Sequence, residues 1–195
     1  MTTQIFQLAQ KSMLQNLRRT LTLALFSSLI VATPLLAQKP SQHAAAHETS
    51  SPNLVQLVRE GTKQYIDVNN ATAAGYGPFL GCVSGDDHGA MGVHYVNGTL
   101  LGNLTLDPSQ PQALIYEPFN GKMTLVGVEF ILDSASWLAA NNDTPPVLNG
   151  QVFNFVGAPN RFHIHSFFEL HVWAWRDNPQ GSFVDWNNNV TCAGD

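Results

Sequence analysis

The chain has little positive charge. Lysine and arginine together account for nine of its 195 residues, and fourteen acidic residues give the whole chain a net charge of −5. The cations are scattered, whereas a groove that follows a phosphate backbone needs them gathered on one face. The sequence therefore argues against nucleic acid as a partner, and equally against an anionic membrane surface.

Familiar catalytic signatures are also missing. The sequence contains no Gly-x-Ser-x-Gly nucleophile elbow, no glycine-rich phosphate loop between a strand and a helix, and no repeat of fixed period. Serine-hydrolase chemistry and nucleotide binding therefore have no support, and the sequence names no catalytic residue. What remains to be explained is a set of seven histidines and several isolated acids.

The first 37 residues have the three parts of a secretory signal peptide. Lys11, Arg18 and Arg19 precede an uncharged run over residues 20–38, and the small residue Ala37 stands near its end. An uncleaved membrane anchor is the alternative, but the run is close to the lower limit of roughly 17–25 residues for a bilayer span and contains several Ser, Thr and Pro residues. We expect residues 1–37 to be removed, and the protein to be secreted or periplasmic without a membrane attachment.

Cleavage would leave a strongly acidic chain with one domain. Three of the nine cations precede the cleavage point, so residues 38–195 carry six cations against fourteen acids, a net charge of −8. Residues 38–50 are polar with no apolar period, which is typical of a flexible tether. Residues 51–195 are then the single folded domain.

The two cysteines, Cys82 and Cys192, both lie in the part expected to be exported. A pair of cysteines in an oxidising compartment indicates a disulfide. The bond would close a long loop, which stabilises the fold by up to ~4.7 kcal/mol on the chain-entropy estimate. Two buried thiols are the alternative.

The pattern of apolar residues predicts one helix followed by strands. Ser51 is a suitable N-cap with Pro52 after it, and apolar residues recur at helical spacing as far as Thr72, before Gly75. Beyond that glycine, short apolar runs alternate with turn signals. The runs cover residues 79–83, 91–96, 113–116, 124–132, 151–156 and 162–176, with a helical turn over 134–140. Asn120-Gly121 predicts a hairpin. We therefore expect an α+β, β-rich fold, with a mostly antiparallel sheet curled into a roll or small barrel.

The last of these runs has an unusual polar face. Side chains two residues apart share one face of a strand, and the even-numbered face here is apolar from Phe162 to Ala174 apart from one serine. The odd-numbered face comprises His163, His165, Phe167, Glu169, His171, Trp173 and Trp175. Histidines and an acid framed by aromatic rings are more typical of a pocket lining than of a solvent face.

Two other runs each carry one polar side chain opposite their larger apolar set. These are His94 and Glu129, and an acid in mid-strand is costly to bury without a partner. Arg161 or Arg176 could pair with Glu129 in an ordinary ion pair.

If the three strands are neighbours, His94, Glu129 and His171 would converge as two imidazoles and a carboxylate. This ligand set suits one divalent transition metal, Zn²⁺, Fe²⁺ or Mn²⁺, with positions left for water or substrate. We predict that the pocket holds such a metal ion or a small molecule, with Tyr116 or Trp173 on its wall. Ordinary buried histidines are the alternative.

Several segments of the chain resemble a widespread, uncharacterised family of exported bacterial proteins. The segments are 89–97, 106–108 with 113–117, 125–130, and 169–175 followed by 178–181, together with 185–187 and Cys192. The resemblance implies export from a bacterium and no particular activity. His94, Glu129 and His171 stand inside these segments.

A shorter stretch is similar to the first metal motif of cupins. Gly157, His163, His165 and Glu169 have the spacing of that motif, which implies the two histidines and the glutamate as an alternative set of metal ligands. The glycine that should close the motif is Arg176, and no histidine beyond residue 171 can supply the second motif.

Three functions are compatible with these observations. The first is an exported small binding protein whose pocket holds a divalent metal or a small ligand. The second is a cupin-like metal-dependent enzyme, and the third is a structural or surface-interaction domain without a site. Whether the protein is an enzyme is left open by the sequence.

Overall fold

The computed structural model describes residues 53–85 and 87–194. The expected signal peptide, the tether over residues 38–50, and the expected helix start at Ser51 and Pro52 lie outside these residues. No helix in the described part of the chain has the length and apolar character needed to cross a membrane.

The structure confirms an α+β, β-rich fold built on a mostly antiparallel sheet. Six strands lie in the order β1-β2-β3-β4-β8-β7, and each neighbouring pair is antiparallel. Their bounds are β1 Tyr76–Ser84, β2 Ala90–Asn97, β3 Ala113–Phe119, β4 Lys122–Asp133, β7 Asn154–Val156 and β8 Phe167–Val172. Because β1 and β7 form the two edges, this sheet is open, and closure into a barrel is wrong. The expected run over residues 151–156 is split: β5 (Val147–Leu148) pairs with β6 (Gln151–Val152) in a separate hairpin.

The expected single helix is divided into three short ones. These are α2 (Leu54–Thr62), the 3₁₀ helix η1 (Lys63–Ile66) and α3 (Val68–Ala73). Asn53 caps α2 by accepting a hydrogen bond from the Gln56 amide, and Asp67, with an extended backbone, caps α3. Position 61 within α2 requires glycine, because a β-carbon there would lie 2.5 Å from Ser109 Cα.

Two other helices are short. The structure confirms the turn expected over residues 134–140 as α5 (Ser134–Ala140), capped by Asp133. A further helix, α4 (Gly98–Leu101), begins after Asn97, whose side chain caps it. It follows β2 directly and was not expected from the sequence.

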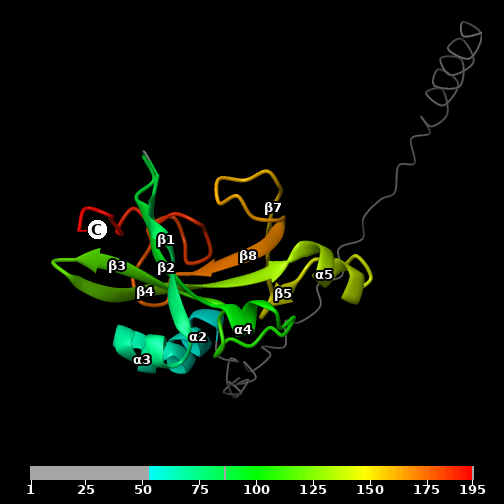
Figure 1. The fold of residues 1–195 in the computed structure, drawn as a ribbon, viewed down its shortest axis with the longest axis horizontal. Helices are drawn as coiled ribbons and strands as arrows, with labels where there is room; N and C mark the ends of the chain where they lie inside the picture. The colour runs from blue at the N-terminus through cyan, green and yellow to red at the C-terminus, as the bar shows by residue number, and fades with distance from the viewer. Residues whose placement is uncertain (1–52, 86, 195) are drawn as a thin grey trace, which may run out of the picture. The chain divides into compact units, whose positions relative to one another are not determined.

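Helices α2 and α3 cover one face of the sheet, where the larger core lies (Figure 1). Leu54 and Val58 of α2 and Ala71 of α3 are buried there against apolar side chains of β3, β4 and β8. Burial of each large side chain is worth roughly 1.5–3 kcal/mol. A hydrogen bond also joins the helical segment to the sheet: the Tyr116 hydroxyl of β3 donates to the Tyr65 carbonyl of η1 at 2.6 Å.

The C-terminal segment covers part of the opposite face (Figure 1). Trp173 and Val190 pack there in a second, smaller core. A disulfide between Cys82 and Cys192 ties this segment to β1, as expected. Glu117 on β3 holds it as well, because its carboxylate accepts a hydrogen bond from the Thr191 amide at 3.0 Å.

A register shift in β4 reverses part of the expected alternation. The shift lies between Ile115 and Tyr116 of β3, which pair with Gly127 and Leu125. As a result Leu125 belongs to the larger core and Val126 to the smaller one, the reverse of what strict alternation predicts.

The long strand expected over residues 162–176 is much shorter in the structure. Residues before Phe167 form a loop in which His163 and His165 are exposed, and the strand ends at Val172. Trp175 then packs against the larger core and donates a hydrogen bond to Thr62 Oγ1 at 3.1 Å. The alternation therefore holds only for the middle of the expected run.

Candidate metal centre

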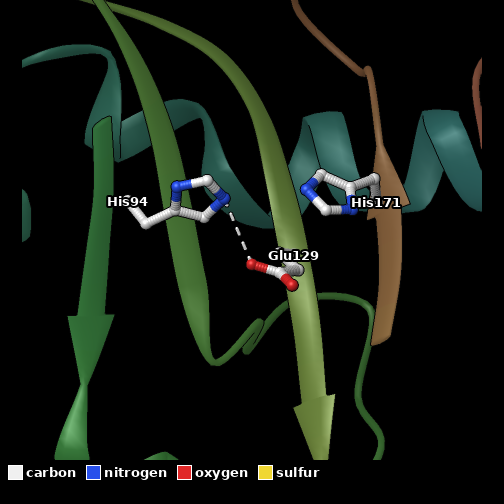
Figure 2. A group of neighbouring side chains, drawn as sticks. All are labelled: His94, Glu129 and His171. Atoms are coloured by element: carbon white, nitrogen blue, oxygen red, sulfur yellow. Dashed lines mark ion pairs between the residues drawn. The ribbon is translucent and has the colours of Figure 1, made fainter. Parts of the chain in front are cut away.

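The structure brings His94, Glu129 and His171 together on one face of the sheet (Figure 2). Glu129 on β4 and His171 on β8 are paired directly across neighbouring strands. His94 comes from β2, which is separated from β4 by β3. Ala113 of β3 lies opposite Glu129, whereas His94 lies opposite Ile115, so His94 approaches Glu129 diagonally across β3.

The three side chains offer their polar atoms to a common space. His94 Nε2 lies 3.2 Å from Glu129 Oε2, and one possible ligand atom from each residue lies within 4.8 Å of the other two. The two imidazole rings are perpendicular, with centroids 5.8 Å apart. Figure 2 shows a ring nitrogen of each histidine directed toward the space beside the carboxylate. Small rotations would bring such donors to the bond lengths of about 2.0–2.2 Å that zinc requires.

His171 is the least satisfied polar group of this cluster. Its side chain is only 1% exposed, and neither ring nitrogen has a hydrogen-bond partner among the described residues. A buried donor or acceptor without a partner costs about 1–3 kcal/mol, so such groups normally have a ligand, a water or an ion beside them. Trp173 stacks on the ring at an interplanar angle of 24° and holds its orientation.

Glu169 adds a second carboxyl group beside Glu129. Burial and the charge of Glu129 raise the pKa of Glu169 to about 10, so this carboxyl keeps its proton and donates it in a hydrogen bond to Glu129. Burial alone would raise the pKa of Glu129 as well. The neighbouring His171 and hydrogen bonds from His94 and Glu169 outweigh it and lower that pKa to about 2.

The protonation states suit a cation site. Burial lowers the pKa of His171, so its imidazole is neutral, which is the form that binds metal ions. Glu129 is ionised at the same pH. The cluster therefore presents neutral imidazole and anionic oxygen, the ligand atoms expected of a zinc, iron or manganese site.

Asp185 lies behind His171 and was missed by the sequence analysis. Its Oδ1 atom is 3.7 Å from His171 Nδ1 and accepts a hydrogen bond from Asn154 Nδ2 at 3.2 Å. Metal-binding histidines commonly direct their second nitrogen to a carboxylate that fixes the ring. Glu169, His171 and Asp185 form a second possible ligand group, which shares His171 with the first. The only signal in the sequence was that Asp185 stands in one of the segments that resemble the exported family.

A cavity of about 50 Å³ lies over this cluster. Its floor contains His94, Glu129 and Glu169, whereas the remaining lining residues are all apolar. These are Phe79, Leu80, Val83, Met91, Val96, Ile131, Phe162, Ile164 and Phe167. His94 and Glu129 of the cluster thus lie in the floor of an apolar pocket, whereas His171 is buried and is not among its lining residues.

The other residues singled out in the sequence lie elsewhere. Trp173 does border the cluster, but Tyr116 points into the larger core on the opposite face and is no part of the pocket wall. The cupin-like set is not brought together, because His163 and His165 are exposed in the loop before β8 whereas Glu169 is buried.

Neither arginine considered as a partner reaches Glu129. Arg161 lies over the ring of Trp186, and Arg176 pairs with Glu117. Glu129 instead faces the two histidines and Glu169.

Fold and site together define a β-rich α+β domain with a buried cluster of two histidines and one carboxylate. Comparisons with protein-family models, curated proteins and solved structures found no match to this chain. Its function therefore has to be argued from the chemistry of the site.

Proposed function

We propose that this is an exported binding protein that holds one divalent transition metal ion through His94, Glu129 and His171. The supporting observation is His171, a buried imidazole with two unpartnered nitrogens, one ligand atom of which lies within 4.8 Å of the other two donors. A metal ion bound between the three residues would give one of those two nitrogens a partner, while the other faces Asp185.

The charge balance favours a cation over a neutral occupant. Glu129 brings one full negative charge into a buried position where no arginine or lysine of the described chain pairs with it. A divalent ion offsets that charge and leaves coordination positions open beyond the three protein ligands. Zn²⁺, Fe²⁺ and Mn²⁺ all accept two imidazoles and a carboxylate.

Export is part of the same proposal. Residues 1–37 act as a signal peptide, and the mature protein is released to the periplasm or the medium. The Cys82–Cys192 disulfide is compatible with an oxidising compartment of this kind.

Metal analysis of protein purified without an affinity tag tests the metal centre. After reconstitution with Zn²⁺, Mn²⁺ or Fe²⁺ in the absence of oxygen and without a thiol reductant, we expect close to one equivalent of a single metal per chain. His171→Asn should lose this metal. His163→Asn is the matched control, because His163 is an exposed histidine outside the cluster. Less than about a tenth of an equivalent of every metal in the wild-type protein would overturn the proposal.

A further inference from the structure

The apolar pocket over the cluster continues into a larger cleft. A second cavity, of about 320 Å³, shares five lining residues with the first. They are Phe79, Val96, Ile131, Ile164 and Phe167. Its outer end is lined by Leu101, Asp133, His165 and Ser166. The two cavities therefore adjoin, with His94 and Glu129 of the metal cluster in the lining of the first and the exposed His165 in the lining of the second.

Large apolar side chains gather at the rim of this cleft. Phe79, Leu80 and Ile164 are 42%, 52% and 38% exposed, yet all three line one or both cavities. Single exposed apolar residues need no explanation, but several around one concave site are typical of a surface that a ligand covers. The occupant must therefore present an apolar surface of its own.

On each side of the cleft, one residue other than glycine has a positive φ angle. Leu80 has a φ of 60° and lies where the register of β1 shifts between Phe79 and Val83. His163, directly before Ile164 on the other side, has a φ of 56°. Side chains other than glycine adopt this conformation at a cost, and such residues concentrate where a ligand is held.

The charged groups that line the two cavities indicate which polar group the ligand should carry. None of the described residues that line the two cavities is a lysine or an arginine, so the protein itself offers no cation to an acid. A divalent ion on His94, Glu129 and His171 would change this, because the three ligands contribute only one negative charge and leave positions open. An anionic oxygen ligand is then attracted to the floor only when the metal is present.

We propose that the cleft binds a linear aliphatic monocarboxylate, with its carboxylate on the metal ion and its chain along the apolar walls. This inference rests on the proposed metal centre. The ligand class follows from a positive floor at the end of a passage lined by apolar side chains. Because each methylene added to the ligand would be buried against these walls, the affinity for the carboxylate should increase with the length of its aliphatic chain.

Calorimetric titration of the zinc-loaded and the metal-free protein with hexanoate, octanoate and decanoate tests the inference. We expect binding to the zinc-loaded protein alone, with an affinity that increases up to about fourfold for each methylene added. Octylamine, which has the same chain and a cationic head, should not bind the zinc-loaded form.

Variants of the rim locate the ligand without touching the metal ligands. Ile164→Ser should weaken octanoate binding at least about fivefold because it removes apolar contact area, and it should leave zinc affinity unchanged. Val152→Ser is the matched control, because Val152 is an exposed apolar residue of β6 that lines neither cavity.

The outcomes separate the two proposals. Zinc binding without octanoate binding overturns the inference about the cleft and leaves the metal centre standing, whereas absence of zinc binding removes both. An affinity that is the same for hexanoate, octanoate and decanoate also overturns the inference, and so does an octanoate affinity that is unchanged in Ile164→Ser. Binding of octylamine to the metal-free protein would show that the cleft serves cations instead.

Discussion

Glu129 of β4 lies directly opposite His171 of β8, with both side chains on the face of the sheet opposite α2 and α3. Paired residues on one face of neighbouring antiparallel strands have β-carbons about 4.5–5.5 Å apart, so their side chains can meet at one ion. This pairing makes the metal centre testable by single substitutions.

Glu129→Gln should weaken zinc binding by at least about a hundredfold, because it removes the only full negative charge of the ligand set at nearly constant size. Isothermal titration with Zn²⁺ measures this change. Glu60→Gln provides the control, since Glu60 is an exposed residue of α2 that pairs with Lys63. Equal zinc affinity in both variants would contradict a role for Glu129 as a ligand.

Asp185→Asn should lower zinc affinity about 10–100-fold while the stoichiometry stays at one ion. Its carboxylate lies 3.7 Å from His171 Nδ1, and we expect it to orient that ring in the metal-bound protein, so the ring of the variant would bind the metal less well but would still bind it. The visible spectrum of the Co²⁺-loaded variant should shift, because the ligand geometry changes. Asp177→Asn, at an exposed position, should change neither quantity. An unaltered Co²⁺ spectrum in Asp185→Asn would show that Asp185 has no influence on the ring.

Glu169→Gln should stabilise the metal-free protein at alkaline pH. The pKa of Glu169 is raised to about 10 in the folded state, mainly by burial and by the charge of Glu129, from an ordinary value of 4.5. The folded chain thus keeps a proton that the unfolded chain releases. The stability that the neutral carboxyl contributes is fully present below about pH 4.5 and is lost as the pH rises toward 10.

The glutamine variant is neutral throughout that range. The difference in unfolding free energy between variant and wild type should therefore grow with pH, by up to about 1.4 kcal/mol per pH unit. Urea denaturation in the presence of a chelator at about pH 5, 7 and 9 measures it. A difference that does not depend on pH would show that Glu169 is not protonated in the folded chain.

Replacing both cysteines by serine should destabilise the domain by up to about 4.7 kcal/mol, because Cys82 and Cys192 are 110 residues apart and the loop they close is long. The double variant avoids leaving a single reactive thiol. Urea denaturation measures the loss, and thiol labelling of the denatured, unreduced wild-type protein should detect no free cysteine. Two reactive thiols per chain in freshly exported protein would contradict the bond.

Local sequence patterns were sufficient for much of the fold. Alternation in the runs that became β2, β4 and β8 placed His94, Glu129 and His171 opposite the larger apolar sets, since side chains two apart share a face. Asn120 and Gly121, which both have positive φ in the structure, predicted the hairpin between β3 and β4. These features depend on neighbouring residues alone.

The tertiary structure decided the rest. The register shift beside Tyr116 moves Val126 to the smaller core, and only pairing with β3 determines it. Asp67 divides the expected helix because its side chain caps a new one. Asp185 reaches His171 from the C-terminal segment, which the disulfide and Glu117 hold against the sheet. Contacts between residues far apart in the chain bring about most of these arrangements, and the energies of those contacts leave no mark on the local pattern.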